Sequence, residues 1–294
     1  MNWTSLDTWI AVTAAITAMA CAVPGTFLFL SRQSMMSHGV AHSVLPGIVI
    51  AFLITHERNW WSLLIGAIAA GILTGVLTRF FQRFGRVEPG AALGITFTSL
   101  FALGLVMVRM LADYVHIEPS HVLYGYLEMS VLDVTDPPSV VWRSFGMLIV
   151  NLILMAVFFK ELRIATFDYE HAAALGFHPL WVQYGIMAAT ATTAVVAFES
   201  VGSILVIAMM IVPPATAYLI TKDLKRLLAL ALVLAAGTSV LGHLISITFL
   251  GGLSAAIFRV EGIGATNSAG GIAVASCLVF LLALAWKRER QVGF

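Results

Sequence analysis

Long apolar runs, separated by short polar connections, dominate this chain. A helix needs about 20 mostly apolar residues to cross a bilayer. Because the bilayer core has no water to hydrogen-bond backbone N–H and C=O groups, such runs are expected to form helices, which satisfy these groups internally. The pattern predicts an all-α polytopic membrane protein with eight or nine transmembrane helices, near residues 9–30, 40–55, 61–80, 90–110, 142–159, 180–198, 201–220, 228–250 and 269–286. The second run is short and contains Pro46, which leaves open whether it is broken or tilted.

Composition supports the same class. Of the 294 residues, 60% are hydrophobic and only 11% are charged, and the mean hydropathy is +0.96. Soluble domains have roughly 25% charged residues. We interpret residues 1–294 as a single transmembrane domain embedded in the lipid bilayer. The net charge of +1 gives no bulk attraction to nucleic acid, so no nucleic-acid partner is expected.

The basic residues predict the orientation of the helices. Short cytoplasmic loops collect Lys and Arg. Twelve of the 16 basic residues follow alternate runs: Arg32, then Arg79, Arg83 and Arg86, then Lys160 and Arg163, then Lys222, Lys225 and Arg226, then Lys287, Arg288 and Arg290. This alternation places the C-terminus in the cytoplasm. Nine crossings then place the N-terminus outside, whereas a second run that does not cross would place it inside.

The stretch SHGVAHSVLPG carries two histidines at the start of the second run. Residues i and i+4 share a helix face, so His38 and His42 are expected to point to the same place. Pro46 cannot donate a hydrogen bond to the carbonyl of His42, which adds a freed oxygen. Imidazole nitrogen is a good ligand for transition metals. Spacing alone leaves two interpretations open, a metal contact and a hydrogen-bonded structural pair. His243, in a later apolar run, is either a residue of the transport path or a hydrogen-bonded core histidine.

Enzyme motifs are missing around these residues. An intramembrane metalloprotease would need H-E-x-x-H, but no carboxylate lies between Asp7 and Glu57. The segment Gly202-Ser203-Ile204 does not complete G-x-S-x-G. A G-x-x-x-x-G-K-[ST] phosphate-binding loop is also missing. The chain is therefore expected not to be an enzyme, and any ATP hydrolysis that drives it would occur on a separate ATPase subunit.

Two connecting segments are candidates for partner contacts. The outer segment between Met110 and Trp142 contains five acids and no Lys or Arg, with Asp113, Glu118 and His121 as candidate entrance residues. It is either an acidic vestibule that concentrates cations or an ordinary solvated loop. The inner segment TFDYEHAAALGF predicts a short helix ending at a glycine C-cap. Its candidate residues for coupling to an ATPase are Phe167, Asp168, Glu170, Ala173 and Gly176.

Several motifs together resemble a known family. They are GTFLFLSRQSMMSHGVAHSVLPGIVIAFL, ALGITFTSLFALGLVM, HIEPSHVLYGYL, TFDYEHAAALGF, VGSILVIAMMIVPPATAYLIT and, loosely, GIGATNSAGGIAV. The chain resembles the permease subunits of bacterial ABC importers for zinc, manganese or iron, the ABC-3 family. The resemblance implies a multi-pass permease of the bacterial cytoplasmic (inner) membrane. A permease of the vitamin B12 or siderophore type is the alternative, and an intramembrane metalloenzyme is a more remote one.

The resemblance also implies partners and pathway residues. The expected partners are an ABC ATPase dimer, an extracytoplasmic metal-binding protein, and a second permease copy or a paralogous permease. No cofactor is expected to be tightly bound, because the divalent metal ion is the cargo. The family motif Gly-Asp-Ala-x-Ser-His places His42 at the metal path and puts His38 where the family has Asp. Two nitrogen ligands favour zinc or iron over manganese.

Overall fold

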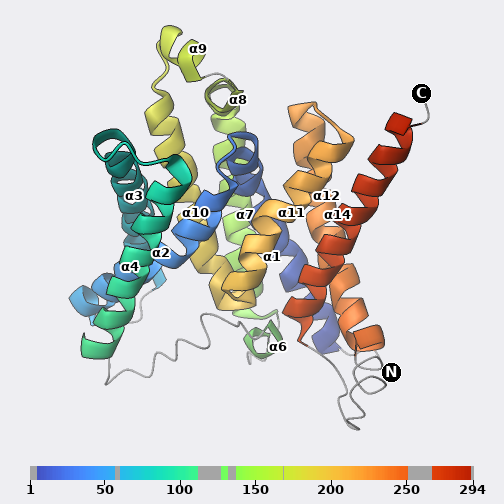
Figure 1. Ribbon diagram of the computed structural model, residues 1–294. Coiled ribbons are helices and arrows are strands. Elements are labelled where there is room, and N and C mark those ends of the chain that lie inside the picture. Colours follow the sequence, from blue (N-terminus) through green and yellow to red (C-terminus); the bar gives the residue numbers. More distant parts are fainter. Residues whose placement is uncertain are drawn as a thin grey trace. The chain divides into compact units, whose positions relative to one another are not determined.

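The computed structural model describes residues 5–56, 60–111, 127–131, 137–167, 169–250 and 267–292. Within these ranges the secondary structure is helical, and nine helices are long and apolar enough to cross a membrane (Figure 1). They are α1 (Ser5–Leu30), α2 (Ser34–Thr55), α3 (Trp60–Phe84), α4 (Pro89–Leu111), α7 (Ser139–Val157), α10 (Pro179–Val201), α11 (Ser203–Ile220), α12 (Leu224–Ile245) and α14 (Ser268–Val292). The predicted all-α polytopic fold is confirmed. Of the predicted eight or nine transmembrane helices, the described residues form nine.

Shorter helices lie in the connections. They are α6 (Leu127–Ser130), α8 (Phe159–Phe167), α9 (Tyr169–Ala174) and a π-helical turn (Ser246–Leu250) that continues α12. The α9 helix falls in the inner segment where the sequence predicts a short helix, and α8 precedes it and ends at Phe167.

The second transmembrane helix differs from the prediction. It begins at Ser34 rather than at residue 40, and it continues through Pro46 without a break. Polar residues at its start made the apolar run look shorter than the helix. One of them, Ser37, is buried, and its hydroxyl donates a 2.6 Å hydrogen bond to the carbonyl of Ser34. Polar side chains that bond their own helix in this way remain compatible with a membrane span.

The fold divides into two compact units. The prediction that residues 1–294 form a single transmembrane domain stays a prediction. Unit 1 contains Met1–Thr26, Ser120–Leu154 and Val196–Phe294. Unit 2 contains Phe27–Pro119 and Met155–Val195.

In unit 2, α2, α3 and α4 pack against one another, and they lie side by side in Figure 1. Small residues let the backbones approach closely, which is typical of helices packed in a membrane. A Cβ atom added at Gly47 would lie 2.7 Å from the Cβ of Ala70, and one added at Gly66 would lie 2.8 Å from the Cβ of Ala51. Two clusters of buried apolar side chains complete the unit: Leu28, Met36, Leu93 and Met187, and Val40, Val44, Ala67 and Ala191.

In unit 1, α11, α12 and α14 pack against one another. A Cβ atom added at Gly242 would lie 2.7 Å from the backbone nitrogen of Ile272, so α12 and α14 are in backbone contact. Hydrogen bonds between buried groups connect elements of this unit. The hydroxyl of Thr17 donates a 3.0 Å hydrogen bond to Ser144, and the amide of Asn151 donates a 3.0 Å bond to the carbonyl of Ala20.

Candidate functional site

The two histidines of SHGVAHSVLPG lie together on α2. The ring centroids of His38 and His42 are 4.6 Å apart, and the ring planes meet at 77°. Both side chains are half-buried. One helical turn separates the residues, so the α-helix itself brings the two imidazoles together, as their i, i+4 spacing predicts.

Two phenylalanines of α4 complete a cluster around them. The ring of Phe97 lies 5.4 Å from that of His38 and 6.5 Å from that of His42. The ring of Phe101 lies 5.4 Å from that of His42. These phenylalanines were not among the predicted site residues. Their own i, i+4 spacing in the fourth run was the signal that could have identified them.

Neighbouring contacts fix the position of this part of α2. A Cβ atom added at Gly104 of α4 would lie 3.0 Å from the backbone nitrogen of Pro46, so the two helices touch just beyond the histidines. On the other side, the hydroxyl oxygens of Ser43 and Thr74 are hydrogen-bonded at 2.6 Å, which ties α2 to α3 beside His42. Both hydroxyls are fully buried. Contacts with α4 and α3 therefore fix the part of α2 that carries the histidines.

The chemistry available here is that of a weak metal contact. Neutral imidazole offers one nitrogen lone pair to a transition-metal ion, and two such rings lie within one helical turn. In the part of the chain that the structure describes, no group of three or more His, Cys, Asp and Glu side chains is placed to hold a metal ion. Two imidazoles without a further protein ligand leave several coordination positions to water or to another subunit. Such a pair can contact an ion, but it does not form a closed, tightly binding site.

The predicted inner helix is present and ends as expected. Gly176 has a φ of +82°, and its N–H donates to the carbonyl of Ala173 at 3.1 Å. The N–H of Phe177 donates to the carbonyl of Ala172 at 3.1 Å, which completes a Schellman motif after α9. Glu170 and Ala173 on α9 and Phe167 at the end of α8 are exposed, whereas Asp168 lies outside the described residues. The candidate entrance residues Asp113, Glu118 and His121 also lie outside them.

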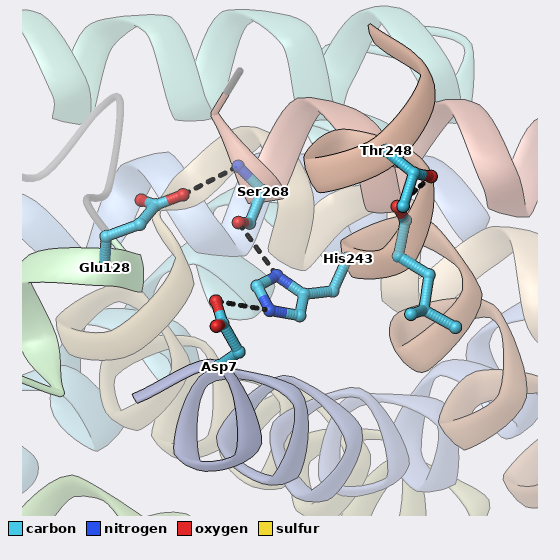
Figure 2. Close-up of polar contacts among 6 residues, drawn as sticks. Asp7, Glu128, His243, Thr248 and Ser268 are labelled. Carbon is cyan, nitrogen blue, oxygen red and sulfur yellow. Dashed lines mark hydrogen bonds and ion pairs between the residues drawn. The ribbon is translucent and has the colours of Figure 1, made fainter. Parts of the chain in front are cut away.

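His243 has a separate polar environment in unit 1 (Figure 2). Its side chain is buried, with Nδ1 lying 3.1 Å from the hydroxyl oxygen of Ser268 and Nε2 lying 3.6 Å from a carboxylate oxygen of Asp7. The backbone N–H of Ser268 donates a 2.8 Å bond to the carboxylate of Glu128. Of the two interpretations of His243, the hydrogen-bonded structural residue fits this arrangement. No local pattern around His243 indicates these partners.

Comparison with known proteins decides the family. The model of the ABC 3 transport family matches residues 6–263. The chain belongs to the ABC 3 transport family. This ABC 3 protein is 35% identical to MntD of Bacillus subtilis, a manganese transport system membrane protein, over 88% of this chain and 90% of MntD. It is 37% identical to TroD of Treponema pallidum, a zinc transport system membrane protein, over 86% of this chain and 71% of TroD.

A solved structure agrees with these sequence matches. PsaBC from Streptococcus pneumoniae, solved in complex with a Fab, superposes with a TM-score of 0.74 and 28% identity. The superposition covers 95% of this ABC 3 protein and 91% of that chain. The predicted family, the permease function and the multi-pass location in the bacterial inner membrane are confirmed. The similarity to transport subunits also agrees with the prediction that the chain is not an enzyme.

Proposed function

We propose that this ABC 3 protein carries divalent transition-metal ions across the membrane and that His38 and His42 touch each ion as it passes. One observation carries the proposal: two half-buried imidazoles lie 4.6 Å apart on one face of α2. Ionisable groups in membrane spans are costly and are usually functional. The manganese and zinc systems named among the relatives support metal as the cargo.

The contact with the ion is transient in this proposal. A transport site must bind strongly enough to admit the ion and weakly enough to release it. Two imidazoles from one chain satisfy both requirements, because water or a facing permease fills the remaining positions. That facing subunit is either a second copy of this chain or a paralogous permease. Nitrogen ligands favour zinc or iron over manganese, although metal supply also influences which ion is carried.

The segment around α9 docks on the ATPase in this proposal. The sequence contains no nucleotide-binding loop, so the energy must enter through a partner. Phe167 and Leu175 are 59% and 54% exposed, and Glu170 and Ala173 are exposed between them. Exposed apolar side chains beside a short, capped helix are typical of a surface that a partner covers. Phe167, Asp168, Glu170, Ala173 and Gly176 are the proposed coupling residues.

The outer side receives the ion in this proposal. Asp113, Glu118 and His121 belong to an outer segment that is acidic and has no Lys or Arg. Clustered negative charge raises the local concentration of cations and speeds their arrival. An extracytoplasmic metal-binding protein is the proposed donor at this entrance.

Uptake in cells tests the function. The chain is expressed with its partner subunits in a bacterial strain that lacks its own metal importers, and uptake of zinc, iron and manganese is compared. The proposal predicts uptake of at least one of these ions, and it predicts that a variant of the partner ATPase without hydrolysis abolishes that uptake. Uptake of vitamin B12 or a siderophore in place of free metal would favour the alternative cargo class.

A further inference from the structure

Two phenylalanines stand against the histidine pair in an arrangement that the transport function alone does not require. His38, His42, Phe97 and Phe101 form what we call the four-ring cluster. Three of its pairs have centroids 4.6 to 5.4 Å apart with interplanar angles between 67° and 83°. Aromatic rings favour such near-perpendicular contacts at centroid separations of 4.5–7 Å. Each histidine ring therefore rests against a phenylalanine in a favourable geometry.

The cluster follows from the register of α2 and α4. Gly39 lies against Leu93, His42 against Phe101, and Pro46 against Gly104. Residue numbers rise together along both helices, so the helices run parallel, and an i, i+4 pair on one faces an i, i+4 pair on the other. The two glycines allow close approach at either end of the cluster. A Cβ atom at Gly39 would lie 2.8 Å from the Cδ1 atom of Leu93, and one at Gly104 would lie 3.0 Å from the Cδ atom of Pro46.

A phenylalanine in this position restricts the histidine in two ways. Its ring favours one orientation of the imidazole and so fixes the direction of the ring nitrogens. Its ring also occupies space around the imidazole that a water molecule or polar ligand would otherwise take. Metal sites discriminate between ions through ligand type and geometry, and geometry needs ligands whose orientation is held by packing.

We propose that Phe97 and Phe101 are positioning residues that set the metal selectivity of the His38–His42 contact. This inference rests on the proposed function of the histidines and adds the residues that orient them. Phe97 has the larger role, because its ring lies near both imidazoles, whereas Phe101 is near His42 alone. An edge-to-face aromatic pair changes an equilibrium by a factor of about 2 to 10. Loss of one ring should change the discrimination between ions by a similar factor.

The test compares Phe97→Leu with Phe97→Tyr in the complete transporter, reconstituted in lipid vesicles with its partner subunits. Leucine removes the aromatic ring but keeps an apolar side chain, and tyrosine keeps the ring. Zinc and manganese uptake are measured at several concentrations, which gives the KM and the maximal rate for each ion. We expect Phe97→Leu to lower the ratio of zinc to manganese uptake efficiency by about 2- to 10-fold. We expect Phe97→Tyr to keep that ratio close to the parent value.

Two controls separate this inference from general packing and from the proposed function. Phe80→Leu removes an exposed ring of α3 and should leave the ratio unchanged. His42→Ala, measured in parallel, tests the proposed function. If His42→Ala loses uptake while Phe97→Leu keeps the parent ratio, the phenylalanines do not set selectivity, and the function stands. If Phe97→Leu and Phe97→Tyr change the ratio equally, the ring geometry is not the cause, and the inference is wrong. If His42→Ala transports normally, both proposals are wrong.

Discussion

Gly47 of α2 and Gly66 of α3 face each other so closely that a Cβ atom on either would overlap the backbone carbonyl of the other. This contact holds the helix that carries His38 and His42. A backbone cannot move aside as the end of a flexible side chain can. Any larger residue at either position must therefore push the two helices apart.

We predict that Gly66→Ala destabilises the protein by about 1–3 kcal/mol, the usual cost of overpacking. Thermal unfolding of the purified chain in detergent measures this effect. Gly185→Ala on α10 is the matched control, because a Cβ atom there would meet nothing within 4 Å. An unchanged unfolding temperature for Gly66→Ala would mean that α2 and α3 do not approach as closely as the structure indicates.

A second prediction concerns the polar contacts of His243. Ser268→Ala removes the hydroxyl that lies 3.1 Å from Nδ1 of the buried ring but keeps the backbone N–H that bonds Glu128. Leaving a buried polar group without a partner costs about 1–3 kcal/mol, so the variant should unfold at a lower temperature. Thr248→Ala is the control, because that exposed hydroxyl donates to the carbonyl of Leu244 one helical turn earlier. Equal stability of the two variants would contradict a stabilising role for the Ser268–His243 contact.

The helices and the inner capped turn follow from local patterns, and so they could be predicted from the sequence. Length and hydropathy define each span, and Gly176 ends α9 because glycine adopts a positive φ at low cost. The start of α2 was not predicted correctly because Ser34 and Ser37 interrupt the apolar run, although the helix itself accepts the hydrogen bond of the Ser37 hydroxyl. The spacing of His38 and His42 placed both rings on one face for the same local reason.

Contacts between helices could not be predicted in the same way. The faces of α4 are almost uniformly apolar, so its pattern does not show that Phe97 turns toward α2. The partners of His243 come from residues 7, 128 and 268, and no local period connects positions so far apart in the chain. These relationships depend on helix rotation and register, which only the assembled structure provides.

A third prediction tests the coupling segment. Glu170→Lys combined with Ala173→Trp reverses a charge and adds bulk on the exposed side of α9. We expect the variant permease to fold normally but to lose co-purification with the ATPase, or stimulation of its ATP hydrolysis, because the docking surface no longer fits. Arg226→Glu, an exposed charge reversal in the first turn of α12, is the control. Normal co-purification and normal stimulated hydrolysis in the double variant would show that α9 does not dock.

The fourth prediction concerns metal preference. His38→Asp replaces a nitrogen ligand by a carboxylate, the residue found at this place in the family motif that the chain resembles. Carboxylate oxygen suits manganese better than imidazole does, so uptake should continue with its preference shifted toward manganese. Competition between zinc and manganese in the same uptake assay measures the shift. An unchanged preference would indicate that the residue at position 38 does not touch the ion.

The most direct test of the account is the initial rate of zinc uptake by His42→Ala in vesicles that contain the complete transporter. His56→Asn, at the C-cap of the same helix, is the matched control, since His56 is exposed and has a φ of 53°, a conformation that asparagine tolerates. Both variants must first assemble with their partners as the parent does. We predict that His42→Ala lowers the uptake rate by about tenfold or more, because a contact with the metal is lost. His56→Asn should keep the parent rate. Parent-like uptake by an assembled His42→Ala transporter would contradict the account.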